Sequence, residues 1–148
     1  MKKPIRRTTK TSRTTKTPKT PKTTARGMKT PRLPADLKIA LAAAMGRQAV
    51  DLRLLDLRKA SSFTDFFVIG TGANVRQVQA IADAVQEALR KHGVKPALVE
   101  GYERAGWVLI DYFDFIVHIF TPATREYYAL ERLWGDAVHI EIPATLNP

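Results

Sequence analysis

The sequence predicts one α/β domain built on a mixed, mostly five-stranded sheet that is flanked by helices. Three observations support this fold class. Short apolar or alternating runs of strand length recur between residues 50 and 120. Segments with apolar residues at helical spacing precede and interrupt these runs. A helix separates residues 66–69 from 97–100, which favours a parallel crossover, whereas the later spacers are short enough for antiparallel hairpins.

The first two elements follow directly from this periodicity. Apolar residues recur at helical spacing from Ala35 to Gln48, which predicts a helix. Residues 50–54 alternate between apolar and charged side chains, as a half-buried strand does. Residues 66–69 are continuously apolar, which is typical of a central strand buried on both faces, and a Gly-Thr-Gly segment ends it.

The second helix is the clearest element. Asn74 can cap its start, and Gln77 stands where a capping-box partner would. Gly93 is placed to end the helix in a left-handed turn. The apolar stripe of this helix consists of Val75, Val78, Ala82, Val85 and Leu89.

Three strand candidates follow the second helix, and the loops between them fit hairpins. Thr121-Pro122 then opens a last helix, because proline suits a first helical turn, and Gly135 closes it. Residues 138–142 could add a short edge strand. The three strand candidates are residues 97–100, 107–111 and 115–120.

Charge divides the chain into unequal parts. The 148 residues are 45% hydrophobic, which suits one domain with a real core. There are 24 Lys and Arg against 14 Asp and Glu, and residues 1–33 hold 12 of the basic residues and no acid. The division predicted is a basic tail (1–33), a slightly acidic domain (34–142) and a short C-terminal tail (143–148).

The basic tail has little to bury, so it is expected to be disordered. It could be a solubilising extension without a fixed role, or an arm that contacts RNA phosphates. A mitochondrial transit peptide is a third interpretation, but Pro18, Pro21 and Pro31 would break its amphipathic helix. The expected location is the bacterial cytoplasm, with the mitochondrial matrix as the alternative.

Two classes of protein are disfavoured by composition. The chain has no cysteine, so it forms no disulfide framework and no thiolate metal site. No apolar run approaches the roughly 20 residues that a membrane helix needs.

The Gly70-Thr71-Gly72 segment is a weak phosphate-binding candidate. It lies between a strand and a helix, where backbone N–H groups favour anions. The third glycine of a dinucleotide fingerprint and the Lys-Ser/Thr pair of a P-loop are both missing. Simple turn geometry explains the glycines equally well.

Asp111 and Asp114 are the candidates for metal-dependent nucleotidyl transfer. Two carboxylates could hold Mg²⁺ together with substrate phosphates. A spacing of three across a turn does not ensure that the two side chains converge. Turn chemistry for one Asp and surface contact for the other is the favoured interpretation, with an enzyme as the rival.

Other side chains do not form a convincing active site. His118 shares a strand face with Ile116 and Phe120, which favours a hydrogen-bonded core histidine over a ligand or base. Ser61 and Ser62 lack a nucleophile motif. We therefore expect a protein that is not an enzyme and that uses neither a metal nor a cofactor.

One group of residues favours binding to a partner. Trp107, Leu109 and Asp111 share a face of their strand, Tyr112 continues into the turn, and Glu100 precedes them. Aromatic and apolar side chains ringed by carboxylates suit a protein-binding hot spot against a basic partner. The alternative is that Trp107 and Leu109 pack beneath a helix as ordinary core.

These same segments resemble the ribosomal silencing factor (Iojap) family. The resemblance covers about residues 35–138, in order and with matching spacing. Each piece is weak alone, but together they are highly specific. The matching pieces are FTDFFVIGTG at 63–72, Arg76-Gln77 with Ala80-Ile81-Ala82-Asp83, Glu100-Gly101, GWVLIDY at 106–112, Asp114 to His118 with Phe120, Arg125, Tyr127-Tyr128, and Leu130-Glu131-x-Leu133-Trp134.

The resemblance implies both a fold and a function. It implies a nucleotidyltransferase-like domain without catalytic residues, which can form homodimers. It implies binding to the large ribosomal subunit through the ribosomal protein called L-fourteen, which blocks association with the small subunit and represses translation. The residues that match the family's contact segment are Trp107, Leu109, Asp111, Tyr112, Glu100 and Gly101.

Three features depart from the family pattern. Phe113 stands where the family usually has glycine, so the turn geometry is expected to be affected. Ala123-Thr124 replaces a more acidic stretch. The basic tail is an extension that the pattern does not explain.

Overall fold

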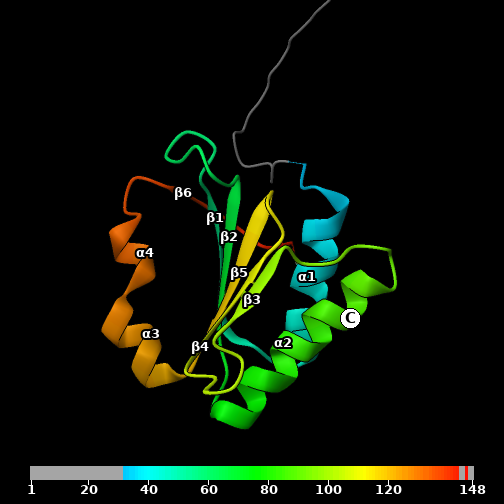
Figure 1. Cartoon of the computed structure of the whole chain (residues 1–148). Helices are drawn as coiled ribbons and strands as arrows, with labels where there is room; N and C mark the ends of the chain where they lie inside the picture. The colour runs from blue at the N-terminus through cyan, green and yellow to red at the C-terminus, as the bar shows by residue number, and fades with distance from the viewer. Residues whose placement is uncertain (1–31, 144–145, 147–148) are drawn as a thin grey trace, which may run out of the picture. The chain divides into compact units, whose positions relative to one another are not determined.

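The computed structural model describes residues 32–143 and 146, and the predicted basic tail up to residue 31 lies outside them. Within this described part the chain forms a mixed sheet and four helices (Figure 1). The elements are α1 (Ala35–Gly46), β1 (Val50–Asp56), β2 (Phe66–Thr71), α2 (Val75–Arg90), β3 (Leu98–Glu100), β4 (Trp107–Asp111), β5 (Phe115–Phe120), α3 (Pro122–Tyr128), α4 (Leu130–Leu133) and β6 (Val138–Ile140).

The sheet has the strand order β3-β4-β5-β2-β1-β6. Strands β2 and β5 pair in parallel at its centre, and the other neighbours pair antiparallel. The α/β class with a mixed sheet is confirmed, but the sheet has six strands among the described residues rather than five. The sixth strand, β6, is the short edge strand that residues 138–142 could add, and it spans three of those residues.

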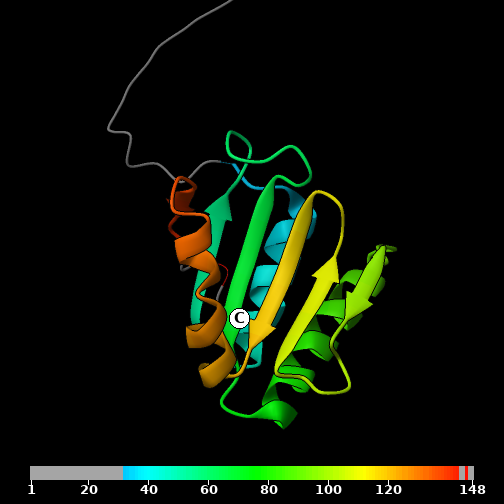
Figure 2. The ribbon, with the colours of Figure 1, turned by 60° about the vertical axis from the view of Figure 1, so that its left-hand side comes forward.

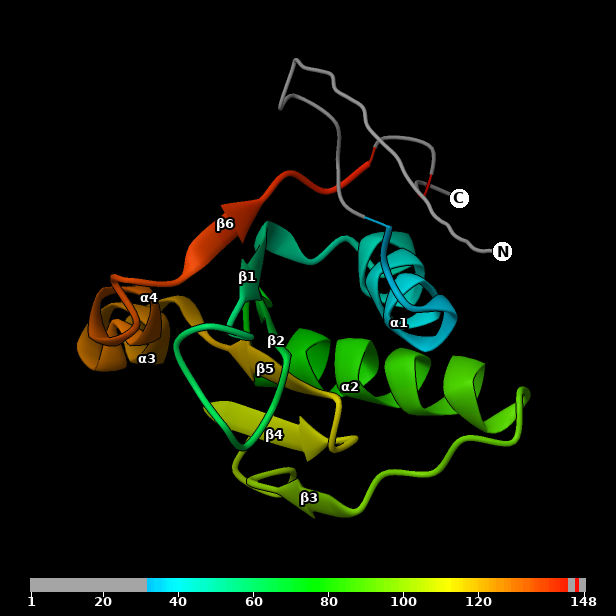
Figure 3. The ribbon, with the colours of Figure 1, turned by 90° about the horizontal axis from the view of Figure 1, so that it is seen from above.

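The crossover through α2 reaches further across the sheet than the spacing suggested. Because β3 and β4, and then β4 and β5, pair antiparallel while β5 runs parallel to β2, β3 is parallel to β2. Two strands, β5 and β4, lie between them. The connection therefore carries α2 across the sheet to its edge (Figure 3).

One face of the sheet, which we call the covered face, is packed beneath α1 and α2 (Figure 3). The cap of α2 follows the predicted pattern: Asn74 Oδ1 accepts a hydrogen bond from the Gln77 backbone N–H at 2.9 Å. Gln77 Oε1 in turn accepts from the Ala73 N–H at 2.7 Å. Leu33, which the predicted boundary assigned to the tail, is 5% exposed and belongs to this core.

The opposite face is covered only in part. Helices α3 and α4 lie over its β1 and β2 side, whereas no helix covers it at β3 and β4 (Figure 2). The single last helix predicted up to Gly135 is wrong. Ala129 adopts a left-handed conformation with φ 46° and ψ 53°, and this breaks the segment into two short helices.

No helix within residues 32–143 has both the length and the apolar character required to cross a membrane.

Candidate functional site

The part of the second face that no helix covers is called the open face here, and cross-strand pairing builds it. Glu100 of β3 pairs with Leu109 of β4, which pairs with His118 of β5. One step along, Leu98 pairs with Asp111, which pairs with Ile116. Directly paired residues project to the same side of a sheet. The open face therefore consists of Leu98, Glu100, Leu109 and Asp111, with Trp107 at its border, whereas Ile116 and His118 of β5 project to the same side but are buried.

An apolar strip with acidic neighbours runs across this surface. Leu98 is 46% exposed, and Leu109 beside it is half-buried. Neither Glu100 nor Asp111 takes part in any of the ion pairs found among residues 32–143. The surface thus offers apolar area together with two carboxylates that have no cationic neighbour bound to them.

Trp107 is both a wall of the open face and part of the core. Its ring stacks on Phe120 at 5.1 Å between centroids and meets Tyr128 of α3 at 4.7 Å. Its indole N–H donates a hydrogen bond to Nδ1 of His118 at 3.0 Å. The two interpretations of Trp107 from the sequence are therefore combined, because this half-buried ring joins the open face to α3.

His118 is a buried, hydrogen-bonded core histidine, as predicted. It is 3% exposed, and its ring lies 4.5 Å from that of Phe67 in an edge-on arrangement. Burial lowers its pKa to about 3, so the imidazole is neutral near pH 7. Because Nδ1 accepts from Trp107, Nε2 carries the proton, and this atom has no partner among the described residues.

Tyr112 does not lie on the open face. It is 7% exposed, belongs to the core of the covered face and stacks on Phe115 at 5.1 Å. Burial raises the pKa of its hydroxyl to about 12. The physical reason is the alternation of the strand, because the residue that follows Asp111 points to the other side of the sheet. The structure does not bring Tyr112 together with Leu109 and Asp111.

Asp111 stabilises the turn that follows it. Its Oδ1 accepts a hydrogen bond from the Phe113 N–H at 2.8 Å, an arrangement typical of Asp in turns. Asp114 is exposed. Across residues 32–143, no three His, Cys, Asp or Glu side chains lie together in a group that could hold a metal ion.

Gly101 shapes the backbone beside the open face. Its φ is +81°, and a Cβ placed there would lie 2.1 Å from the carbonyl oxygen of Trp107. Only glycine fits so close an approach of two backbone segments. Gly101 therefore positions Glu100 and Trp107.

The Gly70-Thr71-Gly72 segment makes contacts that stabilise the fold. A Cβ at Gly72 would meet the backbone nitrogen of Val78 at 2.8 Å, so this glycine permits close packing of α2. The start of α2 is capped by Asn74, and the hydroxyl of Thr71 accepts a hydrogen bond from Arg125 at 2.7 Å. These contacts give the segment a structural role.

Arg125 matches the family pattern, but no role was predicted for it from the sequence. Its guanidinium lies 2.5 Å from a carboxylate oxygen of Glu131 and 3.4 Å from one of Asp51. Partial burial raises the pKa of Glu131, but the hydrogen bonds from Arg125 outweigh this and the pKa is lowered overall. Arg125 thus ties α3 and α4 to the sheet. Its partners are remote in sequence, so no local motif signals them.

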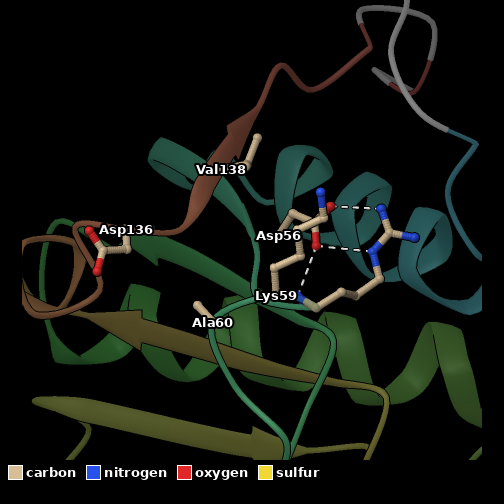
Figure 4. Close-up of a pocket in the computed structure, with 6 residues that line it drawn as sticks. Asp56, Lys59, Ala60, Asp136 and Val138 are labelled. Carbon is tan, nitrogen blue, oxygen red and sulfur yellow. Dashed lines mark hydrogen bonds and ion pairs between the residues drawn. The ribbon is translucent and has the colours of Figure 1, made fainter.

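A pocket of about 240 Å³ lies between the end of β1 and the start of β6 (Figure 4). Arg58 donates hydrogen bonds to both carboxylate oxygens of Asp56, at 3.0 and 2.7 Å. This hydrogen bonding from Arg58 lowers the pKa of Asp56. The main charged pair of the pocket, Asp56 with Arg58, is therefore already satisfied within the chain. The lining residues are Asp56, Arg58, Lys59, Ala60, Asp136 and Val138.

Comparison with known proteins places this chain in a family. Residues 30–148 match the family model described as "Ribosomal silencing factor during starvation". The ribosomal silencing factor RsfS of Bacillus subtilis is 40% identical over 111 residues, which is 75% of this chain and 94% of that protein. The chloroplastic protein Iojap of Zea mays is 35% identical over 96 residues, 65% of this chain and 42% of that protein.

Solved structures agree with the sequence comparison. A crystal structure of a Chromobacterium violaceum protein matches with a TM-score of 0.66 and 37% identity, covering 74% of this chain and 88% of that one. A Bacillus halodurans structure matches with a TM-score of 0.65 and 38% identity, covering 72% of this chain and 96% of that one. The resemblance found in the sequence is confirmed, and the chain belongs to the ribosomal silencing factor family.

Proposed function

We propose that this protein binds the large ribosomal subunit through its open face, docks against ribosomal protein L-fourteen, and blocks association with the small subunit. Repression of translation then follows from steric obstruction and requires no catalytic turnover. The observation that carries the proposal is the half of the sheet that no helix covers, where an apolar strip lies beside the carboxylates of Glu100 and Asp111.

The chemistry of the open face suits a basic protein partner. Leu98 and Leu109 supply apolar area whose burial favours association. Glu100 and Asp111 would meet basic groups, which steers encounter and fixes orientation more than it adds affinity. Trp107 forms the wall of the surface next to α3, and its rigid aromatic ring is of the kind that dominates binding energy.

The proposed roles differ from those that the sequence implied at two positions. Tyr112 supports the surface from the covered face, since its side chain is in that core. Gly101 supports it by allowing the close approach of the Trp107 carbonyl. Trp107, Leu109, Asp111 and Glu100 remain the proposed contact residues.

The test is co-sedimentation of the full chain with purified large subunits, run beside a light-scattering assay of subunit joining. The test variant combines Glu100→Lys with Asp111→Asn, because asparagine keeps the oxygen that accepts from Phe113 while removing the charge. We expect binding to weaken roughly tenfold and joining to recover. Glu126→Lys on α3, an exposed carboxylate that is not one of the open-face residues, is the matched control and should bind normally.

The outcomes of this test distinguish an error in the proposed function from an error in the proposed contact surface. If the native chain neither sediments with large subunits nor slows joining, the proposed function is wrong. If the native chain binds and the double variant binds equally well, the function stands but the open face is not the contact surface.

Three further parts of the proposal, which concern cofactors, the N-terminal segment and the oligomeric state, have direct measurements. The protein is proposed to work without a metal or a nucleotide, so thermal unfolding should not shift when Mg²⁺ and nucleoside triphosphates are added. Binding should survive deletion of residues 1–31, whereas an RNA contact by that segment would add salt-dependent affinity. The cytoplasm of a bacterium is the proposed location, and a homodimer in the absence of ribosomes would appear in analytical ultracentrifugation.

A further inference from the structure

Phe113 has an unusual combination of backbone conformation and exposure. Its φ is +71°, in the left-handed region that glycine and asparagine tolerate and that bulky residues rarely adopt. Its side chain is 71% exposed. A large apolar residue therefore stands where the backbone disfavours it and where folding gains little from burying it.

The hairpin itself imposes this conformation. The Phe113 N–H donates to Asp111 Oδ1, and the Phe113 carbonyl accepts from the Thr64 hydroxyl, both at 2.8 Å. The Asp114 N–H donates to the Tyr112 carbonyl at 2.9 Å and closes the turn. These bonds fix the backbone on both sides of Phe113, so the ring is displayed from a rigid support.

Nothing in the described part of the chain explains the ring through packing. The aromatic pairs found there do not include Phe113. Two other exposed apolar residues belong to segments that are bonded to the turn or to its strand. Leu98, 46% exposed, pairs across the sheet with Asp111, and Phe63, 57% exposed, precedes the Thr64 that holds the turn.

We propose that Phe113 is a partner-contact residue, which extends the open face beyond Asp111 and inserts its ring into an apolar recess of a protein partner. Strained residues that persist in a rigid setting are concentrated at functional positions. A pre-positioned aromatic ring also loses little conformational entropy on binding. The inference rests on the proposed function, because it needs the open face to be the docking surface.

The charges around the turn favour a protein over a nucleic acid. Phe113 lies between Tyr112 and Asp114, and its N–H donates a hydrogen bond to the carboxylate of Asp111. Neither of these carboxylates is neutralised by an ion pair within residues 32–143. Two negative groups beside the ring repel RNA phosphates and attract basic protein side chains.

The variant Phe113→Gly tests the proposal because it moves stability and binding in opposite directions. Glycine relieves the left-handed strain, so the unfolding temperature should rise by about 3 °C. Loss of the ring should weaken binding of the full chain to purified large subunits by about tenfold. A variant that is more stable and yet binds more weakly cannot be explained by damage to the fold.

Two further variants control for the backbone and for general loss of aromatic surface. Phe113→Asn tolerates the left-handed conformation without supplying a ring, so it should match Phe113→Gly in binding. Tyr127→Ala removes an 81% exposed aromatic side chain from α3, away from the turn, and should bind like the native chain. Phe113→Tyr retains the ring and should retain binding.

The proposal is overturned if Phe113→Gly binds large subunits as tightly as the native chain does. It is also overturned if Phe113→Gly weakens binding to protein-free ribosomal RNA as much as binding to whole subunits, since the ring would then stack on RNA. Failure of the native chain to bind large subunits is a different result, because it rejects the proposed function itself.

Discussion

The two faces of the sheet are built from the same strands but differ in how they are covered. On β4, Val108 and Ile110 point to the covered face and are fully buried beneath the α1–α2 layer. Leu109 lies between them in sequence, points to the opposite face and is half-buried. Adjacent residues of one strand thus lie in a dry core and at a surface.

This difference separates stability from recognition. Apolar residues beneath α1 and α2 lose all contact with water, which is the main source of folding free energy. The open face keeps apolar area in contact with water and can gain that free energy only when a partner covers it. Substitutions on the two faces are therefore expected to have different consequences, and three of them test the comparison.

The largest expected difference is between neighbouring residues of β4. Ile110→Ala should lower the free energy of unfolding by about 3 kcal/mol, because it leaves a cavity in a fully buried site. Leu109→Ala should lower it by only about 1 kcal/mol, because its site is partly hydrated. Urea unfolding of both variants measures this. Equal losses would show that the open face is as firmly packed as the covered one.

The second comparison concerns the helices that cover part of the open side. Arg125→Met should cost about 2 kcal/mol, because it leaves Glu131 and the Thr71 hydroxyl without their partner in a mostly buried setting. Hydrogen exchange should speed up in α3 and α4 and remain slow in α2. The matched control is Arg90→Met, which removes an exposed pair with Glu87 and should change little. Uniformly faster exchange would contradict a local role.

The third comparison uses pH and the buried His118. Its folded pKa of about 3 lies below the unfolded value of 6.5, so the unfolded state gains the proton first as pH falls. The contribution of this neutral imidazole to the free energy of unfolding is fully present above pH 6.5 and is lost progressively as the pH falls toward 3. Between pH 7 and 5 this amounts to about 2 kcal/mol.

Replacing His118 by glutamine removes this titration and should flatten the pH dependence of unfolding by that amount. A native slope that persists in His118→Gln would assign the acid sensitivity to other groups.

Much of the fold was predictable because periodicity reports burial directly. The capped stripe of α2 and the continuous apolar run of β2 identified their elements. The break at Ala129 was not predictable, because alanine favours helix. The left-handed turn lies beside the tertiary contacts of Arg125 and Leu130, which no local pattern shows. The sequence predicted β6 only as an optional edge strand over residues 138–142, because three residues give almost no pattern of their own.

The candidate site was predictable where strand alternation determines the face to which a side chain points. The shared face of Trp107, Leu109 and Asp111 follows from a period of two and is confirmed by the pairing register. The resemblance grouped Tyr112 with its neighbours in sequence, whereas alternation puts its side chain in the core of the covered face. The Arg125 contacts could not be predicted, since they join residues far apart along the chain.

The position of β1 has a consequence for how the chain folds. Leu54 pairs with Val68 on one side but with Ile140, near the other end of the described chain, on the other. Synthesis proceeds at about 5–20 residues per second, so β1 waits on the order of several seconds for its second neighbour. Until β6 arrives, β1 presents an unpaired edge to which other nascent chains can add. Strand β6, the last of the described chain, thus covers residues 54–56 of the β1 edge only once it has been synthesised.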